Sequence, residues 1–218
     1  MTTRFKICCM QNVEEARLAI EHGASALGFV SAMPSGFGPI SDQKIAEIIA
    51  AVPEPIATFL LTCATDAKTI ADQQRRSGAN TLQLVDEMEP GTYAALRDAL
   101  PDVSLVQVIH VAGEQSLRDA IKVAPEVDAI LLDSGNPSLA VKELGGTGRV
   151  HDWEISRRIR ESVDVPIYLA GGLRAENVAE AIASVRPFAV DVCTGLRTGG
   201  ALDPVKLERF VTAVRAAA

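Results

Sequence analysis

The stretch Val165-Pro166-Ile167-Tyr168-Leu169-Ala170-Gly171-Gly172-Leu173 contains the pattern from which the fold is predicted. A short aliphatic run, typical of a buried parallel strand, ends at two glycines. A segment with helical spacing follows at Ala175–Val185. The same order of strand, loop and helix recurs in both directions along the chain.

Eight short, mostly aliphatic segments are predicted as strands: Arg4–Ile7, Ser25–Val30, Ile56–Leu61, Asn80–Leu84, Val103–Ile109, Val127–Leu132, Val165–Ala170 and Phe188–Val192. Eight segments with one apolar face, several opened by a capping residue, are predicted as helices: Asn12–Gly23, Ser41–Val52, Asp66–Gly78, Thr92–Leu100, Gln115–Val123, Asp152–Glu161, Ala175–Val185 and Asp203–Arg215. Eight strands that are each followed by a helix predict an α/β protein with a single (β/α)8 TIM barrel domain over residues 1–218.

An open doubly wound sheet is the alternative fold. It usually has fewer repeats and a glycine-rich turn after its first strand. This chain has Cys8-Cys9-Met10-Gln11 there, without a glycine. The closed barrel is therefore favoured.

Composition limits the partners. The formal net charge is -7, which argues against nucleic acid or an anionic membrane as the main partner. The start of the chain lacks the apolar stretch of a signal peptide, and no apolar run reaches membrane-spanning length. The four cysteines form no CxxC pair and have no histidines at zinc spacing. A cytoplasmic protein without a metal or cofactor is expected, and the oligomeric state stays open.

Two glycine- and proline-rich connections are unusually long, Ser31–Ile40 and Ser134–His151. Three glycine clusters lie in the second half: Gly145-Gly146-Thr147-Gly148, Gly171-Gly172 and Thr194-Gly195. Barrels commonly bind phosphate with the loops after strands seven and eight, so we predict a phosphate site at Gly171, Gly172, Thr194 and Gly195. For any single glycine, a tight turn is the simpler explanation.

Three polar residues end predicted strands: Cys8, Asp133 and Asp191. Lys6 and Cys8 share a strand face, so an ammonium group near the thiol would favour the thiolate and make Cys8 a proton acceptor. Asp133 follows an apolar run and must be paired, protonated or functional. The alternatives are that Cys8 is a small buried hydrophobe and that Asp191 is structural. The other cysteines, Cys9, Cys63 and Cys193, are interpreted as packing or loop residues.

These motifs resemble those of one known family in order and spacing over nearly the full length. They are Lys6-Ile7-Cys8-Cys9, Gly23–Val30, Leu82-Gln83-Leu84, Leu131-Leu132-Asp133-Ser134, Gly145-Gly146-Thr147-Gly148 with Asp152-Trp153, Leu169–Leu173, Asn177-Val178 and Asp191-Val192-Cys193-Thr194-Gly195. The chain resembles phosphoribosylanthranilate isomerase, which converts an aminoaldose phosphate to an aminoketose in tryptophan biosynthesis.

The resemblance implies that Cys8 is the general base and Asp133 the general acid. It implies a small phosphorylated sugar as substrate, with its phosphate on the glycines after strands seven and eight. Contacts with the rest of the substrate are assigned to Lys6, Gln83, Gly146 and Asp191.

The chain departs from the family pattern at three places. The family has Ser-Pro-Arg after strand two, and its arginine binds the anthranilate carboxylate, whereas this chain has no basic residue between Val30 and Lys44. Val85-Asp86 stands where the family has His-Gly, and Cys9 stands at a position that is usually glycine. Arg149 and Arg174 are candidates to replace the arginine. The alternatives are a paralogue acting on another phosphorylated sugar and a barrel that binds a phosphorylated metabolite without turnover.

Overall fold

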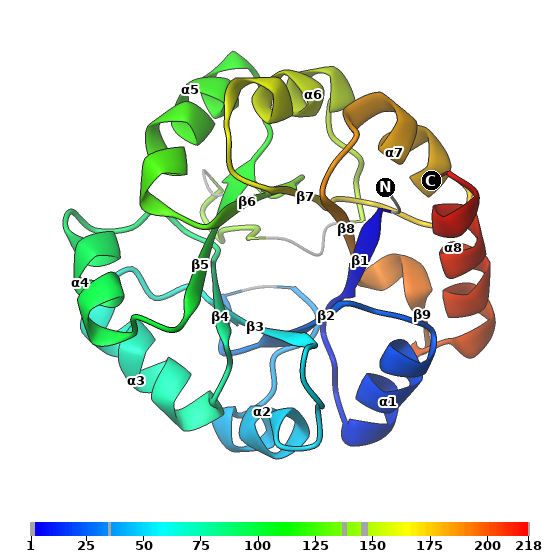
Figure 1. The fold of residues 1–218 in the computed structure, drawn as a ribbon, viewed down its shortest axis with the longest axis horizontal. Coiled ribbons are helices and arrows are strands. Elements are labelled where there is room, and N and C mark those ends of the chain that lie inside the picture. The colour runs from blue at the N-terminus through cyan, green and yellow to red at the C-terminus, as the bar shows by residue number, and fades with distance from the viewer. Residues whose placement is uncertain (1–2, 35, 137–138, 145–147, 218) are drawn as a thin grey trace.

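The computed structural model describes residues 3–34, 36–136, 139–144 and 148–217. Eight parallel strands close into a barrel in sequence order, with the last strand paired to the first (Figure 1). The strands are β1 Arg4–Ile7, β2 Ala26–Val30, β3 Ala57–Thr62, β4 Thr81–Leu84, β5 Ser104–His110, β6 Ala129–Asp133, β7 Ile167–Leu169 and β8 Ala189–Val192. The TIM barrel prediction is confirmed, and the doubly wound alternative is wrong because no open edge exists between β1 and β8.

A ring of helices surrounds the barrel (Figure 1). They are α1 Val13–Glu21, α2 Asp42–Ile49, α3 Ala67–Ser77, α4 Thr92–Ala99, α5 Glu114–Val123, α6 Trp153–Ser162, α7 Val178–Val185 and α8 Pro204–Ala216. Side chains of Asn12, Ser41 and Asp66 accept hydrogen bonds from backbone N–H groups of the first turns of α1, α2 and α3. These caps satisfy donors that have no partner inside the helix, which is why the helices begin where the sequence predicts.

Two layers of apolar residues result from the alternation of the strands. One layer lies between the sheet and the helices and includes Phe29, Ile130 and Phe210. The other fills the barrel interior and includes Phe59 and Leu131. The barrel interior is therefore a packed core.

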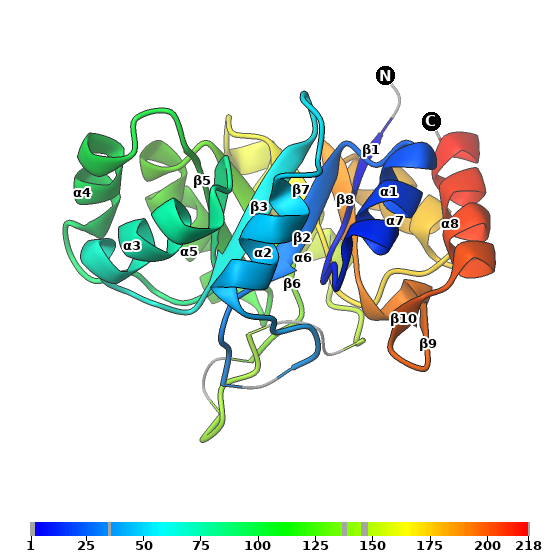
Figure 2. The same ribbon diagram turned by 90° about the horizontal axis from the view of Figure 1, so that it is seen from below.

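The loops after β2 and β6 project from the end of the barrel opposite the chain termini (Figure 2). A short antiparallel hairpin, β9 Arg197–Thr198 and β10 Ala201–Leu202, projects on the same side. The sequence prediction missed this hairpin and the 3-10 turn before it, Thr194–Leu196, because both are too short to have a hydrophobic period. Within the described residues, no helix is long and apolar enough to cross a membrane.

The predicted start of α7 is wrong by three residues. Ala175 was expected to be helical, but the helix begins at Val178. Asn177 is occupied in the preceding turn, where its side chain accepts from the Arg174 N–H at 2.8 Å and donates to the Gly172 carbonyl at 3.0 Å. The Gly171-Gly172 pair is therefore held by a polar turn and does not directly precede a helix N-terminus.

Candidate active site

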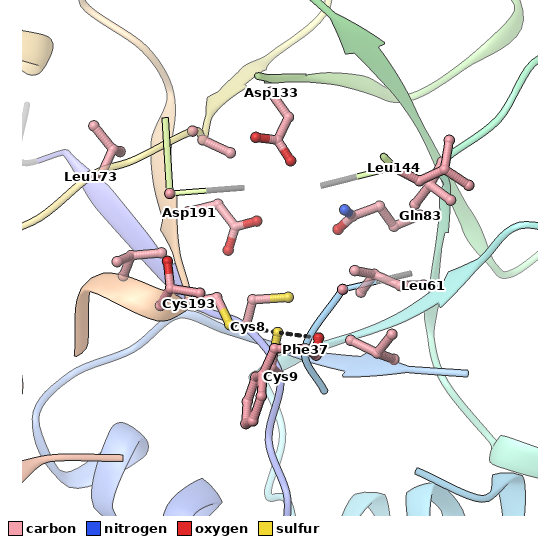
Figure 3. Close-up of a pocket in the computed structure, with 18 of the residues that line it drawn as sticks. Cys8, Cys9, Phe37, Leu61, Gln83, Asp133, Leu144, Leu173, Asp191 and Cys193 are labelled. Carbon is pink, nitrogen blue, oxygen red and sulfur yellow. Dashed lines mark hydrogen bonds between the residues drawn. The ribbon is translucent and has the colours of Figure 1, made fainter. Parts of the chain in front are cut away.

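A cavity open to solvent lies at the carboxyl ends of the strands. Its described lining includes one polar and one apolar set of residues. The polar set is Cys8, Cys9, Gln83, Asp133, Asp191, Cys193 and Thr194, and the apolar set is Val30, Met33, Phe37, Leu61, Val85, Leu144, Ala170, Leu173 and Val192. Gly36, Gly148, Gly171 and Gly172 complete it. Figure 3 shows Asp133, Asp191 and Gln83 directed toward the centre from different strands.

Lys6, Asp191 and Cys8 form a charged group under the cavity. Lys6 has no exposed surface, and its Nζ lies 2.8 Å from Asp191 Oδ2. Lys6 and Cys8 both approach Gly28, since a Cβ built there would lie 3.1 Å from Lys6 Nζ and 2.6 Å from Cys8 Sγ. The ammonium and the thiol are thus packed on the same side of β2. Lys6 itself does not line the cavity, so it reaches a ligand only through Asp191 or Cys8.

The surroundings of Cys8 favour its thiolate. Interaction with the Cys9 thiol lowers the pKa of Cys8, burial opposes that effect, and the Lys6 ammonium lowers the pKa further. The net shift is downward. For Lys6, burial disfavours the charge, but Asp191 and the thiols outweigh it and raise its pKa above the ordinary value. Lys6 therefore stays cationic beside Cys8.

Asp133 has the opposite shift. Burial raises its pKa, while hydrogen bonding from Ser134 and the charge of His110 only partly compensate. Its Oδ1 accepts from the Ser134 N–H at 2.7 Å. The cavity is thus lined by a carboxyl group whose pKa is raised and a thiol whose pKa is lowered, the combination that acid and base catalysis requires.

Two buried oxygens in the cavity have no partner among the described residues, Gln83 Oε1 and Asp191 Oδ1. Buried acceptors normally find a donor, so these two oxygens are candidates to accept hydrogen bonds from a ligand. Sequence reasoning selected both residues.

The phosphate residues predicted after β7 and β8 lie next to one another. Gly171 and Gly172 have φ of 84° and 61°, a region that favours glycine. A Cβ at Gly172 would lie 2.6 Å from the Arg149 backbone, and one at Gly195 would overlap the Leu173 carbonyl. The three loops therefore pack through their glycines, with Gly171, Gly172 and Thr194 at the cavity wall and Gly195 behind it. Gly146 lies outside the described residues.

Neither candidate arginine lines the described cavity. Arg149 pairs with Glu143, and Arg174 Nε lies 3.6 Å from Glu176 Oε2. Phe37, which sequence reasoning left unassigned, lies at the cavity mouth and covers the Arg197 guanidinium at 4.9 Å.

Cys9 and Cys193 line the cavity as well, with their Sγ atoms 2.6 Å apart. Sequence reasoning interpreted both as packing or loop residues. They are 184 positions apart in the chain, and no local pattern signals their contact.

Comparison with known proteins supports one family. The family model for N-(5'-phosphoribosyl)anthranilate (PRA) isomerase matches residues 5–213. The chain is 36% identical to the N-(5'-phosphoribosyl)anthranilate isomerase of Methanothrix thermoacetophila, with 98% of each chain covered. It is 32% identical to that of Methanosarcina acetivorans, covering 98% of this chain and 93% of the relative.

Solved structures agree. The phosphoribosyl anthranilate isomerase of Thermotoga maritima is 29% identical, with a TM-score of 0.82 over 98% of this chain and 99% of the other. Another such isomerase, with a TM-score of 0.80, 27% identity and the same coverage, was solved in complex with reduced 1-(o-carboxyphenylamino)-1-deoxyribulose 5-phosphate.

Proposed function

The chain belongs to the N-(5'-phosphoribosyl)anthranilate isomerase family, and from that membership we propose that Cys8 and Asp133 carry out the proton transfers of its reaction. The reaction converts an aminoaldose phosphate to an aminoketose, a step of tryptophan biosynthesis. The observation that carries the proposal is the pair of opposite pKa shifts, lowered at Cys8 and raised at Asp133, in one cavity.

Asp133 acts first, as the general acid. Its protonated carboxyl group gives a proton to the ring oxygen of the furanose, and the C1–O bond breaks as nitrogen supplies an electron pair. The product is an open-chain iminium ion. Because burial raises the pKa of Asp133, its carboxyl group keeps the proton to a higher pH than an exposed aspartate does.

Cys8 then acts as the general base. Its thiolate takes the proton from the second carbon of the sugar, and the electron pair neutralises the iminium nitrogen to form an enolamine. Tautomerisation of the enolamine gives the ketone, so atoms and charge balance within one isomerisation. The Lys6 ammonium, fixed by Asp191 at 2.8 Å, keeps the thiolate favoured before the substrate arrives.

The phosphate is assigned to the loops after β7 and β8. Within the described part of the chain, the backbone N–H of Gly172 donates to no other protein group. A glycine backbone that approaches a ligand closely, next to the Thr194 hydroxyl group, is typical of an anion site. Gln83 Oε1 and Asp191 Oδ1 then accept from the sugar hydroxyl groups.

The aromatic ring of the aglycone is assigned to the apolar part of the cavity, which includes Met33, Leu61, Val85 and Leu144. The described lining holds no lysine or arginine to pair with a carboxylate. That observation favours a second candidate, the same rearrangement on an aminoaldose phosphate with an uncharged aglycone.

The test is turnover of freshly generated phosphoribosylanthranilate, followed by the loss of anthranilate fluorescence. We expect turnover by the wild type, its near abolition in Asp133→Asn, and a large loss in Cys8→Ser. A loss smaller than about tenfold in Cys8→Ser, equivalent to ~1.4 kcal/mol of activation free energy, would contradict the role of Cys8. Binding of inorganic phosphate without turnover would instead favour a different substrate or a binding role.

A further inference from the structure

We propose that Cys9 and Cys193 form a reversible disulfide at the mouth of the cavity, a modification site through which small disulfides slow the enzyme. The two Sγ atoms are 2.6 Å apart, and both residues line the cavity (Figure 3). The Cys193 thiol donates to the Cys9 sulfur at that separation. Formation of the cross-link itself does not depend on the role proposed for Cys8.

The backbone on both sides holds the two thiols in place. Cys193 directly follows β8, and Cys9 is the second residue after the neighbouring end of β1, where Ile7 pairs with Val192. The Cys8 N–H donates to the Val192 carbonyl at 2.8 Å, so the strand pairing continues to the residue before Cys9. The two sulfurs therefore lie next to each other at the end of the paired strands β1 and β8.

The position of the Cys9 sulfur is set by its own backbone and by its neighbours. Cys9 has φ of 65°, a conformation unusual for a residue with a side chain. Its carbonyl accepts from Gln11 Nε2 at 3.2 Å and from Arg197 Nη2. Gly38 makes room for the thiol, since a Cβ at Gly38 would lie 3.0 Å from Cys9 Sγ.

Unequal exposure sets the order of the chemistry. Cys193 is partly exposed, whereas Cys9 is 5% exposed. The Cys193 thiolate attacks one sulfur of a disulfide RS–SR, forming Cys193–S–SR and releasing RS⁻. Cys9 then loses its proton to RS⁻ or solvent and attacks the Cys193 sulfur, which releases the second RS⁻. The two cysteines lose two electrons in total, and RS–SR is reduced to two RSH.

The cross-link changes the surroundings of the catalytic thiol. The Cys9 thiol is the neighbour that most favours the Cys8 thiolate, and oxidation removes its hydrogen. The link also ties Cys9 to the residue that precedes Thr194 in the predicted phosphate loop. The expected loss of rate rests on the proposed function of Cys8, and the two are tested separately.

The first experiment maps the cross-link. The reduced protein is incubated with oxidised glutathione, remaining thiols are alkylated, and tryptic peptides are analysed by mass spectrometry without reduction. We expect peptide 7–17 joined to peptide 175–197 in the wild type and in Cys8→Ser, and not in Cys9→Ser or Cys193→Ser. Loss of the joined peptide in Cys8→Ser, its persistence in Cys9→Ser, or glutathione adducts alone would overturn the proposal.

The second experiment measures turnover before and after oxidised glutathione, as a ratio for each variant. The wild type and the matched control Cys63→Ser should lose turnover after oxidation, because the Cys9 thiol no longer lowers the pKa of Cys8, and should recover it with reductant. Cys193→Ser should keep its ratio near one. If the joined peptide forms and turnover is unchanged, the proposal that the disulfide slows the enzyme is wrong. Full activity of Cys8→Ser would contradict the proposed role of Cys8 as the base. The disulfide would then be judged from the peptide analysis alone.

Discussion

Among single residues, Gly28 on β2 leaves the space that holds Cys8, the proposed base. It has no side chain at the point where Lys6 Nζ and Cys8 Sγ come together. Its backbone does not need a left-handed φ, so the requirement for glycine is one of space alone. A pattern of aliphatic residues cannot reveal this requirement, because it depends on two side chains of another strand.

Gly28→Ala should therefore displace the Cys8 thiol and lower kcat at least tenfold, since a shift of about 1 Å at a catalytic group has large effects on rate. The new Cβ would lie 2.6 Å from Cys8 Sγ. The variant should also be destabilised by roughly 1–3 kcal/mol, as overpacked cores are. Urea unfolding measures this cost. In a Cys8→Ala background the cost should largely disappear, and an equal cost in both backgrounds would contradict the steric explanation.

Lys6→Met tests whether the charge of Lys6 lowers the pKa of Cys8, the proposed base. Removal of the ammonium takes away a charge that lowers the pKa of Cys8 and leaves Asp191 unpaired, which raises that pKa further. The rate of Cys8 alkylation by iodoacetamide, assigned by peptide fragmentation, should reach its midpoint at higher pH than in the wild type. Stability should fall by about 3–5 kcal/mol because one buried charge loses its partner. Lys6→Met with Asp191→Asn is the control, and it should recover part of the stability.

At the scale of elements, the loops after β6, β7 and β8 act together at one side of the cavity. His151, just before α6, lies against the glycine turn after β7, since a Cβ at Gly171 would lie 2.8 Å from its Nδ1. Its Nε2 is 2.8 Å from Ser156 Oγ in the first turns of α6. The His151 ring thus contacts both the N-terminal part of α6 and the predicted phosphate loop after β7.

Burial lowers the pKa of His151 to about 4, and Asp152 only partly opposes this. The unfolded chain, with a histidine pKa of about 6.5, binds the proton more readily, so folding stability falls as pH decreases from about 6.5 to about 4. The loss from this residue is on the order of 3 kcal/mol. His151→Gln should lose less stability than the wild type between pH 7 and pH 4.5 in urea unfolding. Parallel decreases in both proteins would show that His151 is not the cause.

At the scale of the whole molecule, closure of the barrel places Cys8, which follows β1, and Asp133, at the end of β6, in one cavity. In the proposed mechanism Cys8 must be ionised and Asp133 protonated, so the plot of kcat/KM against pH should be bell-shaped. Turnover should fall at low pH as the thiolate gains a proton and at high pH as Asp133 loses its own. The two apparent pKa values belong to the pair. A rate that keeps rising at alkaline pH would contradict Asp133 as the acid.

Strand and helix periods are local properties of the chain, and they were enough to predict the barrel. The predicted strand Arg4–Ile7 has the observed bounds, and the other strands differ by one or a few residues at their ends. Errors arose where a side chain acts on a turn, as Asn177 does before α7. The 3-10 turn and the hairpin Arg197–Leu202 depend on contacts such as Arg197 with Glu15, which no local period encodes.

The sequence by itself determined the closed barrel, the family and the residues proposed for acid, base and phosphate, because hydrophobic period and motif order follow the chain. Only the tertiary structure decided that Lys6 is buried against Asp191, that Gly28 leaves room for the Cys8 thiol, and that Cys9 meets Cys193. These three facts are contacts between distant segments. The contacts of Lys6 with Asp191 and of Cys9 with Cys193 arise when closure of the barrel pairs β1 with β8, since that pairing places residues more than 180 positions apart side by side. The contact of Gly28 with Cys8 arises where β2 pairs with β1.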